Sequence, residues 1–194
     1  MWKQMIPGLR MTILLTVLTG LIYPGVVTGI CQVLFPAQAN GSVITRNGKV
    51  IGSSLIGQNF AKAEYFQPRP SAAGNDGYDA ANSSGSNLGP TSQKLIDRVK
   101  ASSVKLRADN PAYSGSLPAD LATTSASGLD PHLSPASAKV QVQRVAAARG
   151  VQSAALEQLV DQLTEGRDLG FLGEPRVNVL LLNLALDEKF PAKK

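Results

Sequence analysis

The hydrophobic pattern separates a long apolar run from a mixed remainder. Residues 11–35 carry no charge, and the first acidic residue of the chain is Glu64. At about 1.5 Å per residue, a helix of this length exceeds the roughly 30 Å hydrocarbon core of a bilayer, which predicts one tilted membrane-spanning helix. A cleaved signal peptide is the alternative, because Ala37-Gln38-Ala39 has the form of a cleavage site. Signal-peptide cores, however, have only about 7–15 apolar residues.

Small and hydroxyl residues recur every four positions within this run. They are Thr12, Thr16, Gly20, Pro24 and Thr28. Such a stripe lets a second helix approach closely and offers it hydroxyl partners, so it predicts packing against another membrane helix. A single anchor that merely contains threonines is the alternative. Pro24 is expected to kink the helix unless its freed carbonyl finds another partner.

The periodicity of the remainder changes repeatedly along the chain and predicts one α+β domain. In residues 42–57, short apolar pairs flank Asn47-Gly48, a strong turn dipeptide, and predict a β-hairpin. The Gly/Ser/Asn/Pro-rich residues 67–90 and the aperiodic residues 110–133 are expected to be loops.

Four later segments are helical in spacing or strongly apolar: 91–107, 134–150, 153–166 and 176–188. Thr91 is expected to cap the first, which should bury Leu95, Val99 and Leu106. Asn110-Pro111 should end it, because a residue before proline is disfavoured in a helix.

The later segments have their own end signals. Ser134-Pro135 marks the start of the second helix and Gly150 its end. Ser153 is expected to cap the third and Gly166 to end it. Residues 176–188 are apolar enough to form a central buried element and fit either a helix or a strand.

Charges near the apolar run predict its orientation. Lys3 and Arg10 precede it, whereas Arg46 and Lys49 follow at a distance. Long domains that follow a span cross the membrane largely regardless of their charge. We therefore expect a cytoplasmic tail at 1–10, a transmembrane helix at 11–35 and an extracytoplasmic α+β domain at 36–194.

Composition narrows the classes of function. Hydrophobic residues make up 43% of the 194 residues and charged residues 17%, with a formal net charge of +5. Disordered chains and nucleic-acid-binding domains are more polar or more strongly basic. Cys31 and His132 are the only residues of their types. Neither an internal disulfide framework nor a metal site is therefore expected.

One short segment offers candidate chemistry. Asp130 and His132 precede Ser134, and a carboxylate, an imidazole and a hydroxyl are the groups of a hydrolase triad. Triads usually join distant segments, so the favoured interpretation is that Asp130 and His132 fix a loop by hydrogen bonds. Glu174 and Arg176 are expected to form a local ion pair and cap. The phosphate-binding motif GxxxxGK[ST] does not occur in the sequence. Spacing alone thus predicts no catalytic residue.

Five motifs, taken in order, carry a family resemblance. They are Arg69-Pro70-Ser71, Ser86-Asn87-Leu88-Gly89-Pro90, Ser127-Gly128-Leu129-Asp130-Pro131-His132, Gln143-Arg144-Val145-Ala146 and Leu172-Gly173-Glu174-Pro175-Arg176-Val177-Asn178-Val179. With the single N-terminal span, this order resembles the C subunit of the bacterial Kdp potassium-transporting ATPase over essentially the whole chain. Each motif is a weak signal by itself, whereas five in order at similar spacing are specific.

The resemblance implies a non-catalytic accessory subunit of an ATP-driven potassium uptake complex in the bacterial inner membrane. Its implied partners are a channel-like potassium-binding subunit, a P-type ATPase subunit, a small membrane peptide and the lipid bilayer, with no nucleic acid. Eight polar residues of the motifs become interaction candidates: Arg69, Asn87, Asp130, His132, Arg144, Glu174, Arg176 and Asn178.

The resemblance also implies that this subunit raises the ATP affinity of the ATPase subunit. ATP is cytoplasmic, whereas the expected topology leaves only residues 1–10 on that side. Ten residues are too few for a nucleotide pocket, which typically has several hundred Å³. We therefore expect no tightly bound cofactor and an indirect effect on ATP, through the conformation of the complex.

Two other classes of function stay open from the sequence. One is a membrane-anchored extracytoplasmic hydrolase that uses Asp130, His132 and Ser134, and the other is a binding or sensor module. The hydrolase hypothesis predicts that the isolated domain has hydrolytic activity. The stripe of small residues in the apolar run favours the accessory subunit, because a mere tether needs no packing face.

Overall fold

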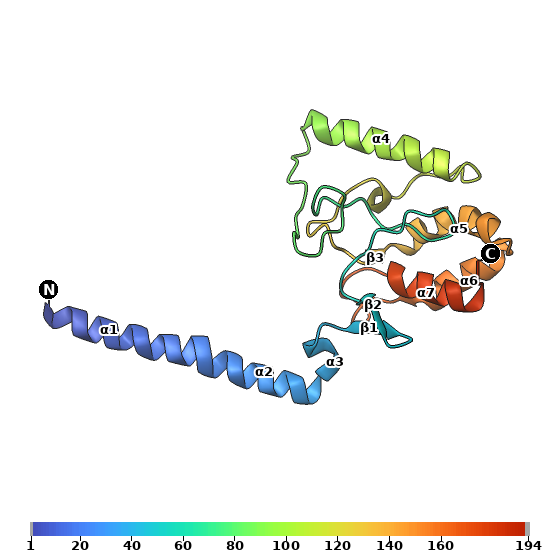
Figure 1. Ribbon diagram of the computed structural model, residues 1–194. Helices are drawn as coiled ribbons and strands as arrows, with labels where there is room; N and C mark the ends of the chain where they lie inside the picture. The colour runs from blue at the N-terminus through green and yellow to red at the C-terminus, as the bar shows by residue number, and fades with distance from the viewer. Residues whose placement is uncertain (1, 193–194) are drawn as a thin grey trace. The chain divides into compact units, whose positions relative to one another are not determined.

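The structure is a computed structural model that describes residues 2–192. It consists of two compact units, Met1–Ser53 and Ser54–Lys194, and each is described by itself (Figure 1). Residue 1 of the expected tail and residues 193–194 of the expected domain lie outside the described residues.

One apolar helix makes up most of the first unit. α1 (Trp2–Val17), η1 (Leu18–Ile22) and α2 (Tyr23–Leu34) follow one another without a break (Figure 1). Lys3–Leu34 is the one helix among the described residues that is long and apolar enough to cross a membrane. Since α1 begins at Trp2, the expected tail is helical over its described residues.

A widened turn precedes Pro24 in this helix. η1 is π-helical, and the N–H of Tyr23 at its end donates to the Leu18 carbonyl. Proline has no N–H and its ring crowds the preceding helical turn, so a wider turn accommodates Pro24 without breaking the helix. The chain thus stays helical through Pro24, with a π-helical turn just before the position of the expected kink.

The predicted hairpin is confirmed. After the short α3 (Pro36–Ala39), β1 (Val43–Arg46) pairs antiparallel with β2 (Lys49–Ser53). Between the strands, Asn47 has a φ of 52° and Gly48 a φ of 75°. Two consecutive positive φ values fit a type I′ turn, whose twist matches that of the strands.

The second unit combines a small antiparallel sheet with helices, which confirms the α+β class. Its elements are α4 (Gln93–Asp109), η2 (Ala119–Leu121), β3 (His132–Leu133), α5 (Pro135–Arg149), α6 (Ser153–Gln162), β4 (Thr164–Glu165), β5 (Arg176–Asn178) and α7 (Val179–Lys189). The strands pair in the order β3-β5-β4, so the latest strand in sequence is central. α5, α6 and α7 lie together beside this sheet (Figure 1).

The core lies where α5, α6 and α7 meet β5. The start of α5 is as predicted: the Ser134 hydroxyl accepts the N–H of Ser137, Pro135 is the first helical residue, and Gly150 follows the last. The largest fully buried apolar side chains are Phe66, Leu133, Val140, Val142, Val145, Leu156, Val160, Val177, Leu182 and Leu186. Phe66 reaches this core from a loop.

α4 differs from the prediction because none of its residues is buried. Leu95, Val99 and Leu106 are only half-buried. In Figure 1, α4 runs alongside the rest of the unit and is joined to it by loops at both ends. Only one side of the helix therefore meets other residues. Its end before Asn110 is confirmed.

Helix ends elsewhere differ by a few residues. The N-caps are Ser92 and Gln152 rather than Thr91 and Ser153, and neither makes a side-chain capping bond. α6 also ends before the expected Gly166, because the two residues of β4 pair with β5.

The ambiguous segment 176–188 contains both a strand and a helix. β5 is three residues long, and Asn178 then accepts the N–H of Leu181 at 3.1 Å as the cap of α7. The apolar run after Asn178 is therefore helical.

Candidate functional site

Three of the predicted interaction residues meet in one cluster. The Arg69 guanidinium donates from Nη1 to Asp130 Oδ2 at 2.8 Å. The other carboxylate oxygen, Oδ1, accepts the backbone N–H of His132 at 3.0 Å and lies 3.5 Å from His132 Nδ1. Between 22% and 29% of each side chain is exposed. The cluster therefore lies at the surface of the second unit with its charges already paired.

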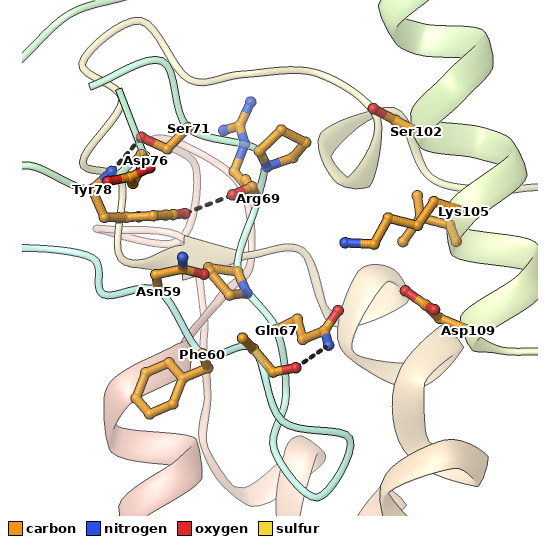
Figure 2. A pocket seen from close by; sticks show the side chains of 15 residues that line it. Asn59, Phe60, Gln67, Arg69, Ser71, Asp76, Tyr78, Ser102, Lys105 and Asp109 are labelled. Atoms are coloured by element: carbon orange, nitrogen blue, oxygen red, sulfur yellow. Dashed lines mark hydrogen bonds between the residues drawn. The ribbon is translucent and has the colours of Figure 1, made fainter. Parts of the chain in front are cut away.

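The Ser71 hydroxyl ties together the two loops that form this cluster. It donates to the Gly128 carbonyl at 2.6 Å and accepts the backbone N–H groups of Ala73 and Tyr78 at 3.1 and 2.8 Å. The Tyr78 hydroxyl in turn donates to the Arg69 carbonyl at 2.7 Å (Figure 2). Because Ser71 and Gly128 are 57 positions apart, their bond fixes one loop against the other.

Close packing around Asp130 requires a glycine at position 57. The Gly57 N–H donates to the Leu129 carbonyl at 2.8 Å. A Cβ at this position would lie 2.6 Å from Tyr78 Cε1 and 2.7 Å from the Asp130 carbonyl oxygen. Both distances are too short for carbon, so any side chain here would displace the turn that holds Asp130.

The surroundings of Asp130 stabilise its charged form. Burial raises the pKa of this carboxyl, but hydrogen bonds from the side chain and backbone of His132 and from Arg69 outweigh it and hold the pKa below its ordinary value. Burial also raises the pKa of the Tyr78 hydroxyl, and the Asp130 charge adds to that rise. A general base works best with a pKa near the operating pH, so these groups suit a structural role better than proton transfer.

A shallow groove of about 500 Å³ passes over the cluster. Five of the eight interaction candidates line it: Arg69, Asp130, His132, Glu174 and Arg176. The groove is therefore the surface at which the predicted residues come together.

Glu174 and Arg176 do not pair with each other, and that expectation is wrong. Glu174 Oε2 lies 2.6 Å from Arg167 Nη2. Arg176 pairs instead with Glu165 at 3.0 Å and with Asp168 at 3.4 Å. The pairing of β4 with β5 places Glu165 opposite Arg176, a contact that the spacing of these residues in the sequence does not indicate.

The other three candidates lie apart from the groove lining. The Asn178 amide donates to the Ser54 carbonyl at 2.8 Å, so this side chain joins the start of α7 to a loop. Arg144 Nε donates to Asn110 Oδ1 at 3.1 Å, and its other nitrogens donate to loop carbonyl oxygens and to the side-chain amide oxygen of Gln141. Asn87 is exposed in the loop before α4, with a φ of 49°.

Ser134 is not placed as a nucleophile. Its Oγ lies 3.2 Å from Asp120 Oδ1 and 2.9 Å from the Ser137 hydroxyl, and its backbone N–H donates to Asp120 Oδ2 at 2.9 Å. A serine nucleophile has to be bonded to its general base. Among the described residues, Ser134 is paired with Asp120 and His132 with Asp130, so the hydrolase triad is not assembled.

A second cavity, of about 370 Å³, lies between α4 and the loop that carries Arg69 (Figure 2). Lys105 reaches into it from α4, and Asp76 and Asp109 also line it. A triphosphate needs several cations or free N–H groups around it. Here two carboxylates accompany one lysine, and the Arg69 guanidinium is engaged by Asp130. The lining does not fit ATP, the nucleotide that the family resemblance implies.

The stripe in the apolar helix is exposed along its whole length. The Thr12 hydroxyl donates to the Gly8 carbonyl of its own helix at 3.0 Å. At Gly20 an added Cβ would come no nearer than 4.0 Å to Thr16. The surface at Gly20 has room for a neighbouring helix, and packing against one stays a prediction.

Two residues that build the site were not among the candidates. Ser71 belongs to the first motif, but a small uncharged hydroxyl residue in a loop does not by itself indicate such a contact. Asp120 lies in the aperiodic segment before β3 and bonds to Ser134, 14 positions later. An acidic residue ahead of a helix start is a weak signal for this contact, because loops often carry acidic residues.

Comparison with known proteins shows the family of the chain. A family model described as KdpC, the K+-transporting ATPase c chain, matches residues 5–188. The chain belongs to the KdpC family. The potassium-transporting ATPase KdpC subunits of Myxococcus xanthus, Koribacter versatilis and Rhodospirillum rubrum are 59%, 56% and 56% identical to it over 191 residues. The alignments cover 98% of this chain and 90%, 97% and 98% of those relatives, which confirms the predicted resemblance.

Membership in the KdpC family makes the chain a non-catalytic accessory subunit of the K+-transporting ATPase. ATP hydrolysis belongs to another chain of that complex, and the other subunits are the partners of this one. The paired charges of the Arg69 cluster agree with such a role.

Proposed function

We propose that this KdpC chain acts from the extracytoplasmic side of the bacterial inner membrane and favours one conformation of the potassium-transporting complex. In this proposal the helix Lys3–Leu34 crosses the membrane with its uncharged part, from residue 11 onward, and residues 1–10 lie on the cytoplasmic side. The second unit lies next to the channel-like potassium-binding subunit, and the P-type ATPase subunit and small membrane peptide complete the assembly. The chain raises the ATP affinity of the ATPase subunit by linkage, because whatever stabilises one conformation also biases a distant site.

The pairing of the charged groups in the groove carries this proposal. Arg69 and His132 both contact Asp130, and Glu174 and Arg176 each pair with a further charged residue. Groups held in this way present a fixed shape and charge pattern to a partner, and the hydroxyl considered as a nucleophile, that of Ser134, is bonded to Asp120 instead. An architectural action on neighbouring subunits fits this arrangement better than chemistry on a small molecule.

A cysteine at Ser114 is expected to react with a membrane-impermeant maleimide in intact spheroplasts. Ser114 is exposed in the loop after α4, and Cys31→Ser removes the only native thiol. A matched Gln4→Cys chain should react only after lysis, because residue 4 lies on the cytoplasmic side in this topology. If position 114 reacts only after lysis, the second unit lies on the ATP side and direct contact with nucleotide becomes the better explanation.

Gly20→Leu is expected to separate the chain from its partner subunits in mild detergent, at least in part. The site is open in the isolated helix, so the larger side chain disturbs only a neighbouring helix. Gly29→Leu is the control, since Gly29 is equally open but lies outside the stripe. Co-purification of the two variants with the other subunits measures the effect, and equal yields would show that the stripe is incidental.

A further inference from the structure

The connection between β4 and β5 displays three large apolar side chains to solvent. Leu169 is 82% exposed, Phe171 69% and Leu172 49%, and we call these three residues the apolar tip. Elsewhere in the second unit, exposed large apolar side chains occur singly: Leu55, Ile96, Val104 and Leu181. Single exposed apolar residues are ordinary, whereas a cluster of them marks an interaction site.

The backbone beneath the apolar tip is fixed. Asp168 and Leu172 exchange two backbone hydrogen bonds of 2.9 Å each, and the Phe171 N–H donates to the Asp168 carbonyl at 3.3 Å. Leu169 adopts a φ of 53°, in the left-handed region that branched side chains rarely occupy. Such a conformation persists only where its surroundings determine it. The tip is thus a rigid projection, which loses little conformational freedom on binding.

The charged side chains around the apolar tip form ion pairs with one another. Arg167 pairs with Glu174 at 2.6 Å, and Arg176 pairs with Glu165 at 3.0 Å and with Asp168 at 3.4 Å. Two arginines therefore face three carboxylates. Binding to an anionic bilayer surface needs unpaired lysine or arginine beside the apolar residues. The hairpin formed by β4, β5 and their connection has a net negative charge instead. The charge pattern favours a protein pocket over a lipid surface.

We propose that the apolar tip inserts into an apolar pocket on another subunit of the potassium-transporting complex. The hairpin that carries it also contributes Glu174 and Arg176 to the groove over the Arg69 cluster. The tip and the groove therefore adjoin, and one partner surface can cover both. An anchor of two or three apolar side chains within a paired polar rim is the arrangement of a binding hot spot. The inference uses membership of the complex but does not depend on the proposed side of the membrane.

Photo-crosslinking in the purified complex tests this contact. A benzophenone amino acid at position 171 is expected to form an adduct with another subunit, identified by mass spectrometry. The same group at position 104, in α4, is the control, because Val104 is 70% exposed and Phe171 69%. We expect at least tenfold more subunit adduct from position 171. Equal yields at both positions, adducts with lipid alone or with a second copy of this chain, or no adduct at 171 would each overturn the proposal.

A paired substitution tests the strength of the contact. Phe171→Ser should raise the concentration of detergent-solubilised complex at which the chain dissociates by roughly tenfold or more. The reason is that one buried aromatic side chain is lost from the interface. Val104→Ser should leave dissociation unchanged. Both side chains are exposed, so the unfolding transition of the free full-length chain should not move in either variant. Equal dissociation of the two variants would show that the tip does not bind a partner.

Discussion

An Arg149→Ala chain is expected to lose about 3–5 kcal/mol of its free energy of unfolding, the usual effect of breaking a buried charged pair. The Arg149 side chain has no exposed surface. It donates to the carbonyls of Glu64 and Phe190 at 2.8 and 2.7 Å and to Asp187 Oδ1 at 2.8 Å. Its guanidinium also lies 4.9 Å from the centre of the Tyr65 ring. Urea-dependent proteolysis of the second unit, with the full chain held in detergent, measures the loss.

The expected loss of stability is large because several hydrogen-bond acceptors lose their donor at once. Without Arg149, the one partner that Asp187 keeps among the described residues is the Tyr65 hydroxyl, which donates to its Oδ2 at 3.1 Å, and two carbonyl oxygens lose their donor. Arg149→Lys should give an intermediate loss, since an ammonium group cannot reproduce the planar fork. The control is Lys139→Ala, which breaks an exposed ion pair with Asp161 and should change stability little. Similar effects of Arg149→Ala and Lys139→Ala would contradict the buried network.

Local signals are sufficient to predict the elements whose ends depend on neighbours in sequence. Ser134-Pro135 and Gly150 mark α5, and Asn47-Gly48 marks the hairpin of the first unit. In each case the capping or turn geometry is completed within a few residues. The sequence therefore predicts these elements with nearly correct bounds.

Pairing between distant segments limits the rest of the fold prediction. β5 exists because Val177 pairs with Leu133 on one side and with Thr164 on the other. Three residues show no period of their own, so the strand cannot be separated in sequence from the apolar helix that follows. The early end of α6 has the same cause, because the residues of β4 leave the helix to pair with β5.

The candidate site shows the same limit. The family resemblance supplies Arg69 and Asp130 separately, but they are 61 positions apart and no spacing pairs them. The sequence does not predict the pair of Arg149 and Asp187 either, because a charged residue on a helix normally faces water. The burial of Arg149 follows from the packing of α5 against the end of the chain, which only the tertiary structure shows.

Asp130→Ala is expected to lower the free energy of unfolding by about 1–3 kcal/mol, because partly buried donors lose their acceptor. Asp130 Oδ2 accepts from Arg69, and Oδ1 accepts the backbone N–H of His132. Arg69 Nε is already buried without a hydrogen-bond partner among the described residues, so little else can compensate. Asp97→Ala is the control, since Asp97 is an exposed carboxylate that accepts a hydrogen bond from Gln93 within α4. Urea-dependent proteolysis of the full chain measures both variants.

The contribution of Asp130 should also depend on pH. Its pKa is lower in the folded chain than its ordinary value of about 3.9. The stabilisation is therefore fully present above that ordinary pKa and is lost as the pH falls through the lowered folded pKa. The difference in stability between the native chain and Asp130→Asn should accordingly shrink below about pH 4. A difference that grows on acidification would contradict the direction of the shift.

The substitution His132→Gln tests whether His132 has a structural role or takes part in the transport cycle. Glutamine keeps a hydrogen-bond donor and acceptor but cannot ionise near neutral pH. The backbone N–H that bonds to Asp130 is unchanged by this substitution. If His132 has a structural role, potassium-stimulated ATP hydrolysis by the purified complex with His132→Gln should stay within about twofold of normal. Asp130→Ala should instead weaken folding or assembly. A near-total loss of hydrolysis in His132→Gln, with unchanged unfolding and subunit content, would make His132 a participant in the transport cycle and overturn the architectural role.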